Sequence, residues 1–166
     1  MPILKAGELD IITTGSEQTH RLGIRLGALL QPGDVVCLSG DMGAGKTVFS
    51  AGIGAGWGAQ HLLTSPTYTL VHEHRRDQDR VRLYHLDCYR LNRAADVESI
   101  GYDDIMDGRG VVVLEWPEKV LNLLPQDRLW VSLRVLDITR RNLIFEGGSQ
   151  RYEALIERFR ETTFGV

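Results

Sequence analysis

The spacing of apolar residues predicts two strands that are buried on both faces. Val35–Leu38 and Val111–Leu114 are continuous apolar runs of the length expected for such strands. The segment that starts at Thr47, after the first run, has a composition that suits a helix. Its three alternating glycines before Gly58 each cost a helix roughly 1 kcal/mol relative to alanine. We therefore expect a short, closely packed helix that Gly58 ends.

An earlier helix is predicted before the first of these strands. Residues 14–17, Thr-Gly-Ser-Glu, fit a capping box. The leucines that follow share one helical face and are expected in the core: Leu22, Leu26 and Leu29 or Leu30. Pro32-Gly33 then predicts the end of the helix.

The second half of the chain departs from a regular alternation of strand and helix. Thr69–Arg75 and Arg80–Asp87 are rich in β-prone residues, and the polar segment between them predicts an antiparallel hairpin. Asn92–Ile105 predicts one or two short helices broken at Gly101. Three further elements are expected, namely strands at Leu129–Leu136 and Asn142–Glu146 and a closing amphipathic helix at Tyr152–Phe159.

Residues 40–47 read GDMGAGKT and match the phosphate-binding loop pattern G-x-x-x-x-G-K-[ST], placed between a buried strand and a helix. Glycines lack Cβ atoms, so the backbone N–H groups can turn toward phosphate oxygens at a helix N-terminus, where the dipole also favours anions. Lys46 is expected to reach the β- and γ-phosphates, and Thr47 to bring its hydroxyl to Mg²⁺. The segment therefore predicts a nucleotide ligand.

These elements predict a single P-loop ATPase domain over residues 1–166. We expect an α/β fold of the P-loop NTPase type, with three layers, a mainly parallel central sheet and an antiparallel hairpin. The length of 166 residues, with 43% apolar and 25% charged residues, fits one globular domain. Ligands of such a sheet bind at the C-terminal edge of its strands.

A nucleotide-hydrolysing site of this kind also needs a carboxylate at the end of a neighbouring strand. Glu115 directly follows the second apolar run, so we expect it at the C-terminal edge, where it can hold magnesium. Asp87, in the segment His85-Leu86-Asp87, is a second candidate for the same magnesium site. Which of the two acids orients the attacking water stays open. Trp116 is either a core residue or a stacking platform for a base.

Two other polar segments allow alternatives. Ser65-Pro66-Thr67 lies where nucleotide switches present a threonine to the γ-phosphate and magnesium, although Thr67 could instead cap a proline turn. The His85-x-Asp87 pair could bind zinc, but third and fourth ligands at suitable spacing are not evident. His72-x-His74 is expected on a solvated strand edge.

Charge and cysteine content limit the partners and the setting. The net charge of −3 argues against binding nucleic acid over a broad face, so we expect indirect contact with RNA at most and no DNA. Cys37 and Cys88 are the two cysteines, and the absence of metal-finger spacing fits a reduced, cytoplasmic protein. No apolar run approaches the roughly 18 residues of a membrane span, so we expect no membrane association.

Four segments together resemble the TsaE family, formerly YjeE, in order and spacing: GDMGAGKT at 40–47, SPTYTL at 65–70, HLDCYR at 85–90 and EWPE at 115–118. The resemblance covers nearly the whole chain. It implies a small bacterial ATPase that uses ATP and Mg²⁺ and is required for threonylcarbamoyladenosine beside the anticodon of tRNAs that read codons beginning with A. It also implies TsaB and TsaD as partners, which perform the chemistry on tRNA in that family.

The resemblance further assigns roles to individual residues. It implies Lys46, Asp87 and Glu115 as the catalytic set and Thr47 and Glu115 as magnesium ligands. The residues implied to contact the nucleotide are Ser16, Thr19, Gly43, Ala44, Gly45, Lys46, Thr47, Val48, Trp116 and Arg140. Met42, Val48 and His74 depart from the residues usual in the family, but none of these differences removes a phosphate or metal ligand.

Two other function classes remain open on the sequence. A small-molecule kinase shares the loop and the sheet but normally needs an arginine-bearing lid and a substrate-binding insert, which are not evident. A nucleotide-gated binding module would use ATP to order the segment at 65–67 and the hairpin without significant hydrolysis. A GTPase is not supported, because a guanine-reading Asn-Lys-x-Asp segment is absent.

Overall fold

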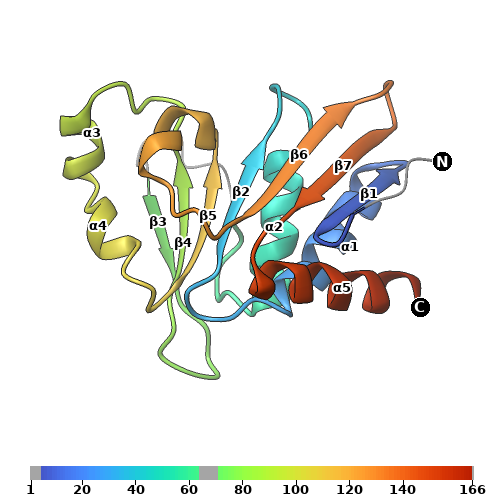
Figure 1. Cartoon of the computed structure of the whole chain (residues 1–166), viewed down its shortest axis with the longest axis horizontal. Coiled ribbons are helices and arrows are strands. Elements are labelled where there is room, and N and C mark those ends of the chain that lie inside the picture. The colour runs from blue at the N-terminus through green and yellow to red at the C-terminus, as the bar shows by residue number, and fades with distance from the viewer. Residues whose placement is uncertain (1–4, 64–70, 166) are drawn as a thin grey trace.

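The computed structural model describes residues 5–63 and 71–165 (Figure 1). In chain order its elements are β1 (Glu8–Thr13), α1 (Ser16–Gly27), β2 (Val35–Ser39), α2 (Lys46–Trp57), β3 (Val71–His74), β4 (Leu83–Asp87), α3 (Ala94–Ser99), α4 (Tyr102–Ile105), β5 (Val111–Glu115), the 3₁₀ helix η1 (Pro117–Leu123), β6 (Leu129–Val135), β7 (Arg141–Glu146) and α5 (Gln150–Phe164). The predicted hairpin, the two short helices broken at Gly101 and the closing helix are confirmed.

The seven strands of the described residues form one sheet in the order β1-β7-β6-β2-β5-β4-β3. β2 pairs in parallel with β5 and β6, and β4 pairs in parallel with β5. β7 pairs antiparallel with β6 and β1, and β3 pairs antiparallel with β4. The sheet is therefore mixed, and the prediction of a mainly parallel sheet holds for its four central strands and not for its two edges.

Strand β1 was not predicted from the sequence. Leu9, Ile11 and Thr13 are buried and alternate with exposed residues, which is the period-two signal of a half-buried strand. The partner strand, β7, lies near the other end of the chain and pairs Leu9 with Phe145. No local pattern reveals such a pairing.

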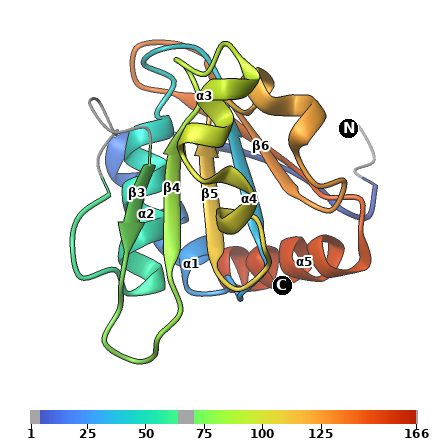
Figure 2. The same ribbon diagram turned by 90° about the vertical axis from the view of Figure 1, so that its left-hand side faces the viewer.

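Alternate residues of the central strands face two separate cores. Val36 and Leu38 of β2 belong to the core that contains residues of α1, α2 and α5, whereas Val35 and Cys37 belong to the core that contains residues of α4 and η1. Helices therefore cover both faces of the sheet. Figure 2 shows α3 and α4 lying over β4 and β5.

Both ends of α1 differ from the prediction, although its leucine face is buried as expected. Gly15 is the N-cap and no side chain caps the helix, so the predicted capping box was wrong. Instead, the Gln18 side chain accepts a hydrogen bond from the Thr14 N–H at 2.8 Å. The helix ends at Gly27, before Pro32, because a tight turn follows in which the Leu30 N–H donates to the Gly27 carbonyl at 3.3 Å.

Glycines bring the backbones of α1 and α2 into direct contact. A Cβ atom on Gly52 would lie 2.2 Å from the His20 carbonyl oxygen, and one on Gly23 would lie 2.4 Å from the Phe49 carbonyl oxygen. The glycines had suggested a short helix, but α2 runs for 12 residues. The close contact with α1 explains this length. Gly58 ends the helix in the left-handed conformation, as predicted, with φ 100°.

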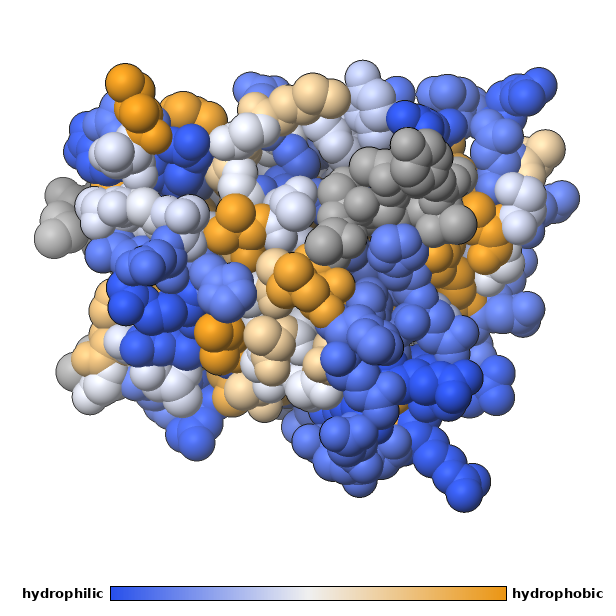
Figure 3. Space-filling model, turned by 180° about the vertical axis from the view of Figure 1, so that it is seen from behind, coloured by the Kyte–Doolittle hydropathy of each residue, from blue (hydrophilic) through white to orange (hydrophobic). Residues whose placement is uncertain are grey.

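The two hairpins differ in surface character. The turn between β3 and β4 projects as a hydrophilic lobe when the molecule is seen from behind (Figure 3). The tip of the β6–β7 hairpin instead carries Ile138, which is 95% exposed.

Among the described helices, none has the length and apolar character required to cross a membrane.

His74 corrects the expectation of a solvated strand edge. Its side chain is buried, and its Nε2 atom has no hydrogen-bond partner among the described residues. Burial, together with the smaller effect of the nearby His85, His72 and His61, lowers the pKa of His74 to about 4. The fold therefore favours neutral His74.

We expect Gly52→Ala to lower the free energy of unfolding by about 1–3 kcal/mol, because the added methyl group would overpack the α1–α2 contact. In an uncrowded helix the same change would stabilise by roughly 1 kcal/mol. Urea unfolding measures the difference, and Gly148→Ala is the control because its Cβ would meet no atom within 4 Å. A Gly52→Ala protein as stable as the parent would contradict the close packing.

We expect His74 to make stability depend on pH between 6.5, its ordinary pKa, and about 4. In this window unfolded His74 binds a proton that folded His74 does not, so the free energy of unfolding falls as the pH falls. His74→Gln should flatten the pH dependence of urea unfolding in this window. Equal slopes for His74→Gln and the parent protein would count against the prediction.

Candidate active site

The segment 40–47 joins the end of β2 to the start of α2, as predicted. Gly40, at φ 152°, passes so close to β6 that a Cβ atom would lie 2.4 Å from the Leu133 carbonyl oxygen. Gly45 is the N-cap of α2 in the left-handed conformation, at φ 104°. Glycine is therefore required at both ends of the loop, by contact at the first position and by backbone conformation at the second.

The backbone N–H groups of this loop form a donor cluster at the helix N-terminus. The Ala44 N–H donates to the Asp41 carbonyl at 3.1 Å, and the Phe49 N–H donates to the Gly45 carbonyl at 2.9 Å. Within the described part of the chain, the N–H groups of the other loop and first-turn positions have no acceptor: Gly43, Gly45, Lys46, Thr47 and Val48. Free donors at a helix N-terminus, together with the helix dipole, fit an anion such as phosphate.

Lys46 lies against this loop with its side chain largely buried. Its ammonium donates to the Asp41 carbonyl at 2.8 Å and also to the Gly40 carbonyl, and it lies 4.5 Å from the centroid of the Trp116 ring. Burial lowers the pKa of Lys46, and nearby carboxylates oppose this shift: Glu115, Glu118, Asp41 and Asp87. The candidate phosphate clamp is therefore surrounded by acids.

Glu115 is the last residue of β5 and pairs with Leu38 of β2 and with Asp87 of β4. Its side chain is only 4% exposed, and its Oε2 atom lies 2.6 Å from Nε2 of the fully buried His85. Sequence reasoning missed this contact. The sequence gives only a weak signal for this contact, because the two residues are 30 positions apart and are brought together only by the pairing of β4 with β5.

Asp87 ends β4, as the predicted bounds of this strand had it. The Tyr89 N–H donates to Asp87 Oδ1 at 3.0 Å, so the chain turns here, and Tyr89 and Arg90 are exposed. The Tyr89 ring packs on Trp116 at a centroid distance of 5.0 Å. Trp116 itself has a positive φ of 58°, which is unusual for a residue other than glycine and orients the ring over Lys46.

The residues implied to line the nucleotide from α1 lie in different environments. The buried Thr19 hydroxyl is 2.8 Å from the Thr13 hydroxyl, and its methyl group is close enough to contact a Cβ atom on Gly45. Ser16 is exposed at the start of the helix. Thr47 is also exposed, with its hydroxyl at the first turn of α2. Thr67 lies outside the described residues.

Arg141, which sequence reasoning missed, contacts the phosphate loop. It donates to the Gly43 carbonyl at 3.2 Å. The neighbouring Arg140, which the resemblance implied, instead forms an ion pair with Asp137 at 2.6 Å within the β6–β7 turn. Two adjacent arginines in a turn cannot be told apart by composition, because the direction of each side chain depends on where β7 begins.

The donor set suits magnesium. Mg²⁺ prefers hard oxygen ligands and is usually held by few protein groups together with phosphate and water. A hydroxyl from Thr47 and the carboxylates of Glu115 and Asp87 are ligands of this type. Within the described residues, His, Cys, Asp and Glu side chains do not form a group of three that could hold a metal ion alone.

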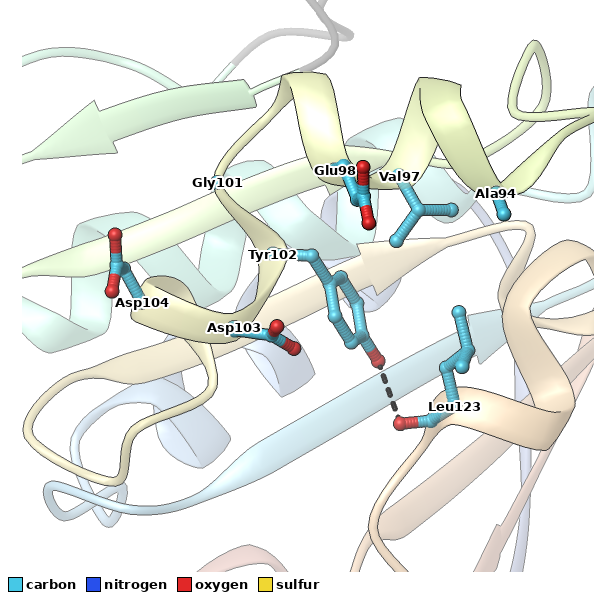
Figure 4. A pocket seen from close by; sticks show the side chains of 8 residues that line it. All are labelled: Ala94, Val97, Glu98, Gly101, Tyr102, Asp103, Asp104 and Leu123. Atoms are coloured by element: carbon cyan, nitrogen blue, oxygen red, sulfur yellow. Dashed lines mark hydrogen bonds between the residues drawn. The ribbon is translucent and has the colours of Figure 1, made fainter.

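A pocket of about 520 Å³ lies elsewhere, between α3, α4 and η1 (Figure 4). The Tyr102 hydroxyl donates to the Leu123 carbonyl at 3.2 Å and joins two of its walls. Its acidic lining residues are Glu98, Asp103 and Asp104. These carboxylates would repel a triphosphate, so the pocket is not the candidate nucleotide site.

Comparison with known proteins identifies the family of this chain. The family described as threonylcarbamoyl adenosine biosynthesis protein TsaE matches residues 13–143. The chain is 35% identical to the tRNA threonylcarbamoyladenosine biosynthesis protein TsaE of Bacillus subtilis, over 87% of this chain and 89% of that protein. It is 42% identical to the protein of the same name from Treponema pallidum, over 75% and 90% of the two chains. The crystal structure of Bacillus subtilis YdiB superposes with a TM-score of 0.79 at 31% identity, covering 94% of this chain and 96% of that one. This chain belongs to the TsaE family.

Proposed function

We propose that this chain is a Mg²⁺-dependent ATPase that acts with TsaB and TsaD in the threonylcarbamoyladenosine modification of tRNAs reading codons that begin with A. The observation that carries the proposal is the loop at 40–47, whose N–H donor cluster has no acceptor among the described residues and whose Lys46 is buried among carboxylates. The names of the relatives supply the pathway. A three-layer, P-loop NTPase-like classification of the fold is part of the same proposal.

The loop binds the phosphates through its backbone and through Lys46. The free N–H groups at the start of α2 donate to phosphate oxygens. Lys46 exchanges the carbonyls of Gly40 and Asp41 for phosphate oxygens, because its ammonium is attracted more strongly to a negatively charged oxygen than to a neutral carbonyl. The Trp116 ring over the ammonium shields this contact from water.

Thr47, Glu115 and Asp87 would hold the metal. Bound Mg²⁺ offsets negative charge on the phosphates and so lowers the barrier to phosphoryl transfer to water. Glu115 or Asp87 orients the attacking water. The backbones of both residues are held at strand ends, which limits the reorganisation needed when the substrate binds.

We expect Lys46→Ala to abolish tight ATP binding and Glu115→Gln to preserve binding but to slow turnover by about a hundredfold or more. Calorimetry measures the affinity, and phosphate release measures turnover. Both variants should also fail to support threonylcarbamoyladenosine formation in a purified system with TsaB, TsaD, tRNA and the remaining substrates of the modification.

The same assays separate the competing functions. A kinase would transfer the phosphate to a small acceptor, and a binding module would support the modification with ATP but release no phosphate. Either result in the parent protein would overturn the ATPase proposal, as would normal hydrolysis by Glu115→Gln.

We expect Arg141→Ala to weaken ATP binding roughly tenfold, which is the size of one hydrogen bond from a charged group. Arg141 contacts the loop carbonyl at Gly43 and places positive charge beside the bound phosphates. Arg140→Ala is the matched control, because its partner is Asp137 in the turn. Equal losses in calorimetry for the two variants would argue against a specific role for Arg141.

A further inference from the structure

We propose that His85 is a positioning residue that holds the Glu115 carboxylate in the orientation required at the magnesium site. This role rests on the proposed function, because it serves that same site. The contact that carries it is the hydrogen bond between His85 Nε2 and Glu115 Oε2 at 2.6 Å.

Burial makes this hydrogen bond important for Glu115. The His85 side chain is fully buried, and that of Glu115 is nearly so. A carboxylate removed from water is costly unless it is paired, because the interior replaces few of its lost hydrogen bonds. His85 is the one side chain among the described residues that forms a hydrogen bond with this carboxylate.

The contact with Glu115 shows which nitrogen of the His85 ring donates. A carboxylate only accepts hydrogen bonds, so the hydrogen lies on Nε2 when Glu115 is ionised. Nδ1 is buried and has no partner among the described residues. The ring therefore directs its single polar contact to Glu115.

The pairing of β4 with β5 holds the backbones of His85 and Glu115 in place, so the rotation of the Glu115 side chain is what remains to be fixed. In the β4–β5 register His85 pairs with Val113 and Asp87 pairs with Glu115. The Cys88 N–H donates to the Glu115 carbonyl at 2.9 Å and extends the pairing by one position. A glutamate side chain has three rotatable bonds, and hydrogen bonding to a metal-ligating carboxylate is the usual means of orienting it.

Replacement of His85 by the two amides tests the hydrogen bond directly. The side-chain nitrogen of Gln can take the position of Nε2 and donate to Glu115, whereas that of Asn takes the position of Nδ1 and falls short. We expect His85→Asn and His85→Leu to lower Mg²⁺-dependent ATP hydrolysis 10–100-fold, the usual effect of losing such a partner. His85→Gln should recover most of the rate. His72→Gln is the control, because His72 pairs with His85 across the strands and makes no hydrogen bond to Glu115.

Two readouts do not depend on catalysis. Calorimetry of ADP binding with and without Mg²⁺ should show that His85→Asn loses the magnesium-dependent part of the affinity and keeps the magnesium-independent part. Nitrogen-15 NMR of the histidine rings should show a protonated, hydrogen-bonded Nε2 for His85, with a change at Nε2 in Glu115→Gln. Thermal unfolding identifies any variant that fails to fold, and the Gln–Asn comparison stands without the Leu variant.

The outcomes separate this proposal from the proposed function. If the parent protein hydrolyses ATP and the Gln and Asn variants behave alike, whether both active or both inactive, the hydrogen bond is not what positions Glu115 and the proposal fails. If the parent protein does not hydrolyse ATP even with TsaB and TsaD, the ATPase proposal fails. The ADP affinities and the NMR signals then decide the role of His85 by themselves.

Discussion

The candidate site depends on the parallel pairing of β5 with β2 on one side and with β4 on the other. This pairing sets Glu115 beside Leu38 and beside Asp87. Parallel strands end at the same edge of a sheet, so three segments far apart in the sequence meet there: the loop after β2, the turn after β4 and the turn after β5. A slip of one residue in β5 would turn the Glu115 side chain to the other face and separate it from His85.

The packing of α2 against α1 fixes the other half of the site. The N-terminus of α2 carries the donor cluster, so its position relative to the sheet decides where phosphate can bind. Glycines in α2 each cost roughly 1 kcal/mol of helix propensity. Backbone contact with α1 and the burial of Phe49 and Ile53 offset that cost and hold the helix in one place. The glycines that weaken α2 as an isolated helix therefore allow the close packing that holds it against α1.

Much of the fold was predictable because its signals are local. Apolar runs identified β2 and β5, and the β-prone stretches identified four further strands. The elements that were missed depend on partners distant in the sequence. β1 needs β7 for its pairing. The order and direction of the strands at the two edges of the sheet cannot be read from the periodicity of apolar residues.

Local sequence patterns predicted one part of the candidate site, and contacts between residues distant in the sequence form the other part. The GDMGAGKT loop and the strand-terminal acids are local patterns, so the sequence located Lys46, Asp87 and Glu115. The contacts of His85 with Glu115 and of Arg141 with Gly43 were missed because they join residues that lie 30 and 98 positions apart in the sequence. Thr14 was assigned as a cap because its residue type is suitable, but Gly15 is the N-cap residue and the Gln18 side chain accepts a hydrogen bond from the Thr14 N–H.

The charges at the sheet edge also constrain what the loop can bind. Four carboxylates lie close enough to oppose the pKa shift that burial imposes on Lys46. The same acids would repel the oxygens of a free triphosphate, whereas the N–H cluster and Lys46 attract them. A divalent cation that arrives with the nucleotide changes this balance, because it pairs with both the phosphates and the acids. In the proposed function, selectivity for a magnesium–nucleotide complex over the free nucleotide therefore follows from the acids beside the loop as much as from the loop itself.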